Sequence, residues 1–527
     1  MNIQSLDKTT WDAVIVGTGL RESLLAAALA RAGKRVLHLD KNPYYGDEYA
    51  AFSGNEFETW VKNAQAAGLQ VVDYFVVDQS ESSIKAKSRS YTLNLSPGLL
   101  YTTSPLLSLL VASNLNESLE FLKVGGWFVY NPSQGIDGSL VSVPNSREDV
   151  FNDQTLDARS KRLVVRALKS ILGLEGSPSA NSSAHQSSLK DYLEQPSFRL
   201  PNQTIAAFAS LTLRHDRLSE IPFEEAERDI RRHFGSIGRF GPGFAAVVSR
   251  YGSGSELVQV FCRAAAVTGN AIYMLENTII SIQGRAPRPN WKAEEGHKSA
   301  ENTRSQGFQL RLQSGDLVWA ENLIATKHNL PIDTTPLGDL PVSIAEDAFW
   351  TSLYIVSNPL RSIFRTNEPP APAGVVVYIP SGSLAEDESR NSYPIYICIH
   401  SSETGECPDG QCIMYISTKG DERKFLDVAA KSLLRKMPRE DGSPSQILMS
   451  VKFKTLVESP LAERRTDGLH LLANHGPLIE IQDEIVDQVI DIYDSIVGSR
   501  ETFMEKLESE DPGDVRDDTE ISFEGAS

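Results

Sequence analysis

The clearest hydrophobic pattern lies at the start of the chain. Residues 11–17 form a short apolar run that ends in glycine, which is typical of a buried strand. Residues 20–32 are rich in Leu and Ala, and Gly33 follows where glycine commonly ends a helix. A second apolar run, residues 35–40, predicts another strand. A strand, a tight turn, a helix and a strand in this order predict a βαβ unit with parallel strands.

The middle of the chain is dominated by helical spacing. Apolar residues recur with the helical period in five segments, at residues 104–111, 115–122, 156–174, 189–193 and 202–213. A short strand is expected at residues 127–130. Residues 177–188 are rich in Ser, Asn and Ala without periodicity, which predicts a flexible insertion. We therefore expect a small helical domain, residues 104–234, inserted into an α/β domain.

The second half of the chain alternates helices with short strands. Helices are expected at residues 255–269, 421–436 and 483–497. Strands are expected at residues 271–275, 279–283, 308–312, 317–320, 323–326, 350–356, 374–379, 393–400 and 412–417. Polar residues 284–306 predict a loose loop, and residues 505–527 predict an acidic disordered tail. The large α/β domain would then consist of residues 1–103 and 235–504.

Charge and length limit the classes of partner. The chain has 527 residues and a formal net charge of −18, which argues against nucleic acid because phosphates demand clustered cations. Proteins and neutral or apolar ligands remain as partners. No secretory signal, membrane-spanning run or C-terminal prenylation motif is visible, so a cytoplasmic protein is expected.

The four cysteines are too few for a disulfide framework in a chain of this length. Cys407 and Cys412 could form half of a metal site, but their spacing is wide and no second pair follows. We favour a loop with two unpaired thiols and expect no metal.

A glycine-rich turn separates the first predicted strand from the first helix. Gly17 and Gly19 are placed as in a dinucleotide-binding loop, where glycines allow close approach of the backbone to a pyrophosphate. Asp40 follows 21 residues after Gly19, at the position of the acid that holds a ribose hydroxyl in working sites. The third position of the loop holds Glu22 instead of Gly or Ala. The fingerprint is therefore degenerate.

Glu22 argues against a bound cofactor. A helix N-terminus attracts anions, but here the first turn already carries a carboxylate close to the place of a pyrophosphate. Two like charges about 4 Å apart repel by roughly 1 kcal/mol in water and about 4 kcal/mol near a protein surface. The alternative is that Glu22 points outward and leaves room for a cofactor. We favour the interpretation in which no cofactor binds.

A second segment supports the loss of the cofactor. Many flavoproteins close the cofactor site with Ala-Thr-Gly followed by an acid, whereas residues 325–329 read Ala-Thr-Lys-His-Asn. We also find no nucleophile with a suitably spaced His and acid, and His38 on an apolar strand is expected to be a core residue. The chain is therefore expected to have no catalytic residues.

Residues 17–23 carry the degenerate loop, and residues 34–46 carry His38, Asp40 and the run Asn-Pro-Tyr-Tyr-Gly. Together these two segments resemble the family of Rab GDP-dissociation inhibitors and Rab escort proteins. Residues 251–263 resemble the second signature of the family, although Ser255 is inserted and Val258 stands where proline is usual. The resemblance extends, loosely, from about residue 11 to about residue 497.

This resemblance implies a flavin-monooxygenase-like FAD/NAD(P)-binding fold with mixed β-sheets and an inserted small α-helical domain. The large domain would bind a GDP-bound Rab GTPase, and the helical domain would shelter its geranylgeranyl lipid. The implied Rab-binding platform consists of Tyr44, Tyr45, Glu256, Arg263 and Met274. The alternative is that Tyr45 is a packed turn residue and that Glu256 and Arg263 are solvated helix charges.

The length of the chain, its polar insertions and the Arg-Phe-Gly-Pro run at residues 239–242 favour an escort protein over a GDP-dissociation inhibitor. Such a protein is the accessory component A of Rab geranylgeranyltransferase: it presents Rab to the catalytic heterodimer and delivers the product to membranes, with transient peripheral membrane association. The expected docking residue for the transferase is Phe208, unless its amphipathic helix buries it. An FAD-dependent oxidoreductase is the less favoured alternative.

Overall fold

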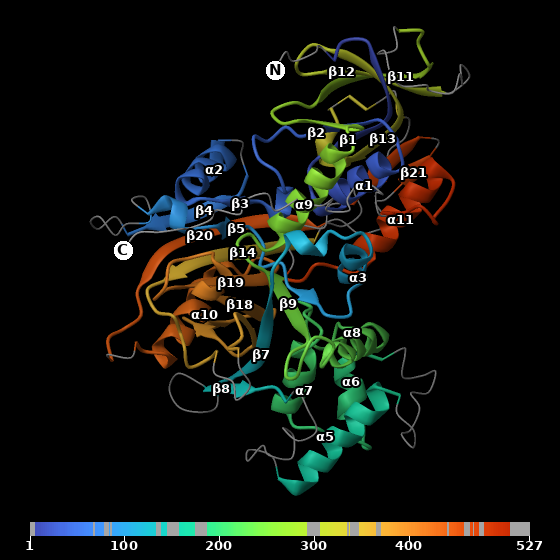
Figure 1. Ribbon diagram of the computed structural model, residues 1–527. Coiled ribbons are helices and arrows are strands. Elements are labelled where there is room, and N and C mark those ends of the chain that lie inside the picture. Colours follow the sequence, from blue (N-terminus) through green and yellow to red (C-terminus); the bar gives the residue numbers. More distant parts are fainter. Residues whose placement is uncertain are drawn as a thin grey trace, which may run out of the picture.

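The computed structural model describes most of the chain. The described residues are 6–66, 69–77, 84, 87–132, 139–144, 157–173, 187–291, 306–331, 333–334, 337, 347–364, 370–439, 442–457, 464–466, 468–473 and 479–505. Two large β-sheets follow one another along the molecule, and a group of helices lies at the end opposite the first sheet (Figure 1).

The first sheet has eight strands and contains the βαβ unit at the start of the chain. Its order is β10-β2-β1-β13-β12-β11, with β22 paired to β13 and β21 paired to β22. The strands are β1 (Thr9–Val16), β2 (Val36–Leu39), β10 (Ala271–Met274), β11 (Ile279–Pro287), β12 (Gln306–Leu312), β13 (Leu317–Thr326), β21 (Arg464–Thr466) and β22 (Leu469–Leu472). β1 is parallel to both β2 and β13, as a βαβ connection requires.

Helices cover one face of this sheet. The helices are α1 (Leu20–Arg31), α3 (Pro105–Ala112), α9 (Gly254–Val267) and α11 (Glu484–Val497). They share a hydrophobic core with alternate strand residues such as Ala13 and Ile15. The intervening residues, Val14 and Val16, pack on the other face against β11 and β12. The alternation of side chains along a strand therefore gives each face its own core.

The second sheet has ten strands and forms the centre of the molecule. Its order is β4-β20-β14-β19-β18-β15-β7-β9-β6, with β8 paired to β7. The strands are β4 (Val71–Val76), β6 (Leu100–Tyr101), β7 (Phe121–Asn131), β8 (Ser139–Ser142), β9 (Ala246–Ser249), β14 (Asp347–Val356), β15 (Gly374–Ile379), β18 (Ile395–Ser401), β19 (Cys412–Lys419) and β20 (Ile447–Val457). One face packs against α10 (Arg423–Lys436), and the other packs against α2 (Gly54–Ala66) and the helices described next.

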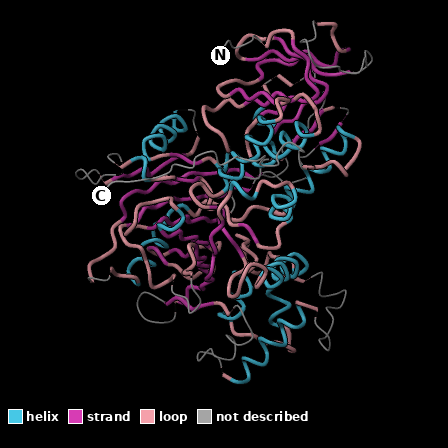
Figure 2. The backbone as a smooth tube through the Cα atoms, in the orientation of Figure 1, coloured by secondary structure: helices cyan, strands magenta, loops and turns pink. Residues whose placement is uncertain are grey.

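The third part of the molecule is helical. It consists of α5 (Ala158–Ile171), α6 (Leu189–Glu194), α7 (Asn202–Ser210) and α8 (Phe223–Ser236). In Figure 2 these helices lie together below the ten-stranded sheet, and α5 is the outermost of them in Figure 1. Two small two-stranded sheets, β3 (Ala51–Phe52) with β5 (Leu93–Asn94) and β16 (Ala385–Glu386) with β17 (Ser389–Arg390), complete the described strands.

The architecture is the expected mixture of α/β sheets and a helical part, and most predicted elements are present. The domain boundaries at residues 104, 234 and 504 stay predictions. Within the predicted helical segment, β7 is a strand of the ten-stranded sheet, and α3 packs beneath the eight-stranded one. The prediction of a helix at residues 115–122 was wrong, because a single 3-10 turn, Asn116–Ser118, leads directly into β7.

Three further details differ from the sequence-based expectations. Residues 317–320 and 323–326 form one continuous strand, β13, since Glu321 and Asn322 remain extended along β1 where the pairing on the other edge changes from β12 to β22. β11 continues to Pro287, into the predicted loose loop. Cys407 and Cys412 are buried free thiols, but Cys412 begins β19 and only Cys407 lies outside a strand. Most of residues 177–188 and nearly all of the tail 505–527 lie outside the described residues.

None of the helices in the described part of the chain combines the length and the apolar character needed to cross a bilayer. Within the same residues, no group of three or more His, Cys, Asp or Glu side chains is arranged to hold a metal ion.

Candidate functional site

The glycine-rich loop is filled by the side chain of Glu22. This residue belongs to the first turn of α1 and is only 5% exposed, so it does not point outward. A Cβ atom placed on Gly19 would lie 2.6 Å from Glu22 Oε2, and one on Gly17 would lie 4.0 Å from Glu22 Oε1. The carboxylate therefore folds back over both glycines, into the space that the missing side chains leave.

A second carboxylate lies against the same loop. Glu48 Oε2 is 3.5 Å from the position of a Cβ on Gly19. Burial, and then the charges of Asp47 and Glu22, raise the pKa of Glu48 well above its ordinary value. The loop is thus lined by acids that already repel one another, which makes it unfavourable for a pyrophosphate.

Asp40 is engaged by the protein itself. Its Oδ2 accepts hydrogen bonds from the Thr18 amide at 2.9 Å and from the Thr18 hydroxyl at 2.6 Å. Its Oδ1 accepts from the Asn42 amide at 2.8 Å, and Thr18 Oγ1 in turn accepts from the Gly46 amide at 3.1 Å. The acid that would hold a ribose hydroxyl in a dinucleotide site instead fixes the loop that carries Tyr44 and Tyr45.

The segment that follows β13 closes the loop from the other side. A Cβ on Gly17 would meet Asn329 Nδ2 at 2.9 Å, and Asn329 Nδ2 also lies 3.5 Å from the Val16 carbonyl oxygen. His38 is fully buried, and its Nε2 lies 2.5 Å from the Gly17 carbonyl oxygen. Burial lowers the pKa of His38 to about 4, so the ring is neutral and donates this hydrogen bond. These residues do not fit a dinucleotide cofactor, because the chain itself occupies the positions of its phosphates and of its ribose contact.

Beside the closed loop, Tyr45 lies at the surface. Its side chain is 37% exposed, and its ring meets the Tyr273 ring edge-on at 6.1 Å between centroids. Tyr273 belongs to β10, which contacts α9, and α9 also contacts the turn Asp47–Tyr49. The Tyr45 loop, β10 and α9 therefore meet at one place. Tyr44 differs, because its half-buried ring packs against Phe52 at 4.8 Å.

The charged residues predicted for the platform lie on α9. Glu256 and Arg263 are seven residues apart, which places them on one face of the helix, roughly 10 Å apart along its axis. Arg263 is exposed, as are Gln259 and Val267 on the same side. Glu256 is half-buried, and burial raises its pKa. The structure thus places Tyr45, Glu256 and Arg263 in neighbouring elements.

Met274 is placed differently from the other predicted platform residues. Its half-buried side chain packs in the core that contains residues of β11 and β12, on one side of the eight-stranded sheet. Tyr273 packs in the core on the opposite side, which contains α9. Tyr273 is the residue that sequence reasoning missed as a neighbour of Tyr45. The alternation of side chains along β10 was the available signal, but its parity could not be fixed without the structure.

The predicted docking residue Phe208 lies in the core. It is 4% exposed and packs in the cluster shared by α5–α8 and the ten-stranded sheet. A side chain with so little exposed area offers a partner almost no contact surface, so its placement matches the alternative of a buried helix face and gives no basis for docking.

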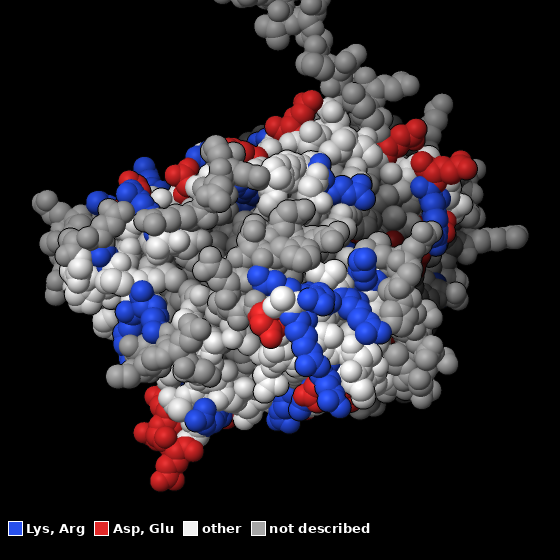
Figure 3. All heavy atoms as spheres, turned by 90° about the horizontal axis from the view of Figure 1, so that it is seen from below, with Lys and Arg blue, Asp and Glu red and all other residues white. Residues whose placement is uncertain are grey.

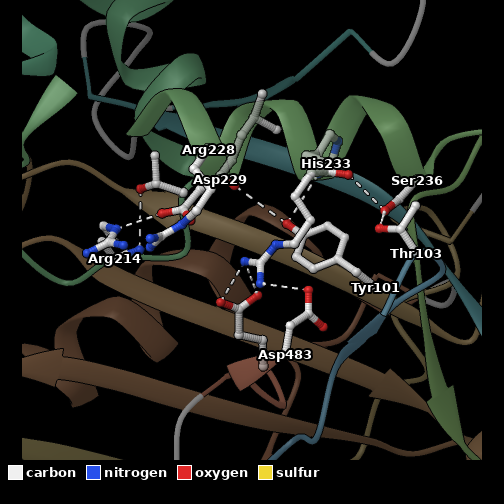
Figure 4. A network of polar contacts seen from close by, with 12 residues as sticks. Tyr101, Thr103, Arg214, Arg228, Asp229, His233, Ser236 and Asp483 are labelled. Atoms are coloured by element: carbon white, nitrogen blue, oxygen red, sulfur yellow. Dashed lines mark hydrogen bonds and ion pairs between the residues drawn. The ribbon is translucent and has the colours of Figure 1, made fainter. Parts of the chain in front are cut away.

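A buried polar network joins α8 to the rest of the molecule (Figure 4). Arg232 donates to both carboxylate oxygens of Glu480, at 2.8 and 2.7 Å, and its guanidinium lies 4.5 Å from the centre of the Tyr101 ring. Burial opposes the charge on Arg232, but Glu480 outweighs it and raises the pKa of Arg232. Asp483, 3.7 Å from Arg232, immediately precedes α11, which contacts α1. The helical part is therefore connected through α11 to the helix that begins at the closed loop.

Comparison with known proteins places this architecture in a family. A family model described as GDP dissociation inhibitor matches residues 6–286. The chain is 29% identical over 438 residues to "Rab proteins geranylgeranyltransferase component A" of Saccharomyces cerevisiae, covering 82% of this chain and 66% of that protein. It is also 29% identical to the protein of the same name from Drosophila melanogaster, over 92% of this chain and 88% of that protein. The chain thus spans just under two thirds of the length of the yeast relative.

Solved structures support the fold. A Rab GDI from Plasmodium falciparum superimposes with a TM-score of 0.64 at 18% identity, over 94% of this chain and 99% of that one. An oxidoreductase from Methanosarcina mazei superimposes with a TM-score of 0.53 at 13% identity, over 91% and 99% of the two chains. The expected α/β fold with mixed β-sheets and a helical part is confirmed by the likeness to both structures. Because the family model covers more than half of its residues, the chain belongs to the GDP dissociation inhibitor family.

Proposed function

We propose that the protein is a Rab escort protein, the accessory component A of a Rab geranylgeranyltransferase. It binds a GDP-bound Rab, presents it to a separate catalytic heterodimer and delivers the prenylated product to membranes. The observation that carries the proposal is the closed loop beside the exposed Tyr45 and α9 surface. A fold that elsewhere holds a cofactor here offers a protein-binding surface.

The chemistry of this surface suits a protein partner. Tyr and Arg are enriched among residues that dominate binding energy, and Tyr45 and Arg263 are both exposed. Glu256 and Arg263 supply charges of opposite sign along one helix, which can fix the orientation of a partner with complementary charges. Met274 contributes from the opposite side of β10, at the sheet edge, rather than from the α9 face.

The names of the relatives favour the escort role over the inhibitor role. The yeast, Drosophila and Candida albicans relatives are all named component A of the transferase. A relative from Schizosaccharomyces pombe at 24% identity is named "Probable secretory pathway GDP dissociation inhibitor 1". Extraction of prenylated Rab from membranes is therefore the second candidate function. Neither role assigns a catalytic step to this chain.

A reconstituted prenylation reaction tests the proposal. Rab, geranylgeranyl diphosphate and the catalytic heterodimer are incubated with and without the chain, and lipid transfer to Rab is measured. The proposal expects transfer only when the chain is present. Transfer at the same rate without the chain, together with extraction of prenylated Rab from membranes, would favour the inhibitor role.

Arg263→Ala tests the surface itself. Loss of an anchoring cation from an interface commonly weakens binding by about 2 kcal/mol, or roughly 30-fold. Lys62→Ala is the control, since Lys62 is an exposed residue of α2, 69% exposed, away from α9. Equal affinity of both variants for Rab·GDP would remove Arg263 from the platform.

A further inference from the structure

Helix α5 carries an unusual row of cations for so acidic a protein. The chain has a net charge of −18, yet α5 contains five cations and no acid between Ala158 and Ile171. Four of the cations are exposed and recur at spacings of three, four and three residues: Arg159, Arg162, Arg166 and Lys169. This spacing aligns them along one side of the helix.

The opposite side of α5 is apolar and buried. Val164, Ala167 and Ile171 pack in the core shared with α6–α8, and Arg231 of α8 donates to the Ile171 carbonyl oxygen at 2.6 Å. Leu163 and Val165 are half-buried and lie at the two edges of the cationic row. The helix is thus firmly held by its apolar side, while apolar side chains border the exposed cations. We refer to Arg159, Arg162, Arg166 and Lys169 as the basic row.

The stability of the helix does not explain the basic row. Cations favour the C-terminal turn of a helix, where Lys169 lies, and are unfavourable in the first turn, where Arg159 lies close to the N-cap residue Asp157. Like charges three and four residues apart also repel one another. Within the described part of the chain, Arg162, Arg166 and Lys169 form no ion pair that would offset this repulsion. A favourable interaction with an external anionic surface would offset it.

The position of α5 leaves the basic row accessible. α5 is the outermost helix at the end of the molecule opposite the eight-stranded sheet (Figure 1). Seen from below, Lys and Arg side chains gather across the middle of this end (Figure 3). We infer that the basic row docks the protein on the anionic surface of a lipid membrane.

A membrane fits the basic row better than an acidic protein does. The core of a protein interface is generally depleted in charged residues and contains aromatic anchors beside its arginines, whereas the basic row consists of four neighbouring charges and α5 has no aromatic residue. An anionic leaflet attracts each nearby cation without demanding a fixed partner position, and it strengthens binding about fivefold per cation. Long side chains can also lay their methylene groups on apolar neighbours such as Leu163 while their charges reach the headgroups.

Vesicle sedimentation tests the inference. The full chain, without any Rab, is mixed with vesicles of phosphatidylcholine alone or of phosphatidylcholine with about 30% phosphatidylserine, a leaflet of the anionic kind that attracts basic segments. We expect binding only to the anionic vesicles, and we expect it to vanish near 1 M salt, where the screening length is about 3 Å. Because no Rab is present, failure here would leave the escort role intact.

Charge variants localise the contact. Arg162→Gln with Arg166→Gln removes two cations but keeps good helix formers, so binding should weaken about 25-fold at fivefold per cation. Arg162→Glu with Arg166→Glu should weaken it further. Lys431→Glu with Arg435→Glu on α10 is the matched control, because both residues are exposed near the end of another 14-residue helix.

Three results would overturn the inference. The first is equal binding of the wild type to neutral and anionic vesicles, or binding to neither. The second is an equal loss of binding in the α5 and α10 variants, which would show that net charge and not the position of the basic row determines vesicle binding. The third is unchanged vesicle binding of the α5 variants combined with poorer prenylation, which would assign the basic row to the transferase instead.

Discussion

Replacing Asp40 with Ala tests whether this acid holds the loop that carries Tyr45. Asp40 accepts three hydrogen bonds, two from Thr18 and one from the Asn42 amide. Its removal leaves two buried donors of Thr18 without their acceptor, and each such loss costs about 1–3 kcal/mol. Burial raises the pKa of Asp40, so the substitution also relieves part of the cost of burying a carboxylate. We therefore expect the free energy of unfolding to fall by about 2–4 kcal/mol.

The same substitution should weaken Rab binding. The Asn42 amide and, through Thr18, the Gly46 amide bracket Tyr44 and Tyr45, so loss of Asp40 loosens the loop that presents Tyr45. Ordering a loosened loop on binding costs free energy and so lowers the affinity for Rab. A cost of about 1.4 kcal/mol corresponds to tenfold weaker binding. Urea unfolding and calorimetric titration with Rab·GDP measure the two effects.

Phe208→Ala is the control for general destabilisation. It removes a buried ring from the helical part, at a cost of about 3–5 kcal/mol, without touching the Tyr45 loop. It should therefore match or exceed the loss of stability of Asp40→Ala while it keeps the affinity for the globular part of Rab. If Asp40→Ala retains both wild-type stability and wild-type affinity, the proposed role of Asp40 in holding the loop is wrong.

Three further predictions concern the fold around the site. Arg232→Met should lower the free energy of unfolding by about 3–5 kcal/mol, because it leaves the Glu480 carboxylate buried without the guanidinium that binds it. The double variant Arg232→Met with Glu480→Leu should regain most of this loss, and urea unfolding measures both. Burial opposes the charge on His400, but Glu406 outweighs burial and raises the pKa of His400 to about 10. The free energy of unfolding should therefore fall as the pH rises from 6.5 towards 10. Thermal unfolding of His400→Gln should show a flatter pH dependence. Gly17→Ala should be more destabilising than Gly19→Ala by about 1–3 kcal/mol, because Gly17 has φ +105° and its Cβ would meet Asn329, whereas a Cβ on Gly19 meets the end of the flexible Glu22 side chain.

Local patterns were sufficient for the βαβ unit and for the degenerate loop. The apolar run of β1, the Leu- and Ala-rich α1 and the terminating Gly33 are short-range signals, and the structure reproduces them within one or two residues. The position of Glu22 in the first helical turn also follows from local geometry. The direction of its carboxylate, towards Gly19 and not outward, agrees with the favoured interpretation.

Long-range contacts were beyond the sequence. Asn329 lies more than 300 residues from Gly17 along the chain, so only the pairing of β1 with β13 brings the two together. Phe208 could not be separated from a surface residue, because the face of α7 that is buried depends on where the ten-stranded sheet lies. The face of the sheet on which Met274 lies depends on the parity of a four-residue strand, because a shift of one residue moves a side chain to the other face.

The account depends most directly on the state of the glycine-rich loop, and titration of the purified, refolded chain with FAD measures it. Both absorbance near 450 nm and calorimetric heat should show no saturable binding, because Glu22, Asn329 and Asp40 occupy the loop or are already bonded within the chain. Stoichiometric uptake of FAD with a flavin spectrum would contradict the closed loop and with it the proposal that this fold serves as a surface for a GTPase.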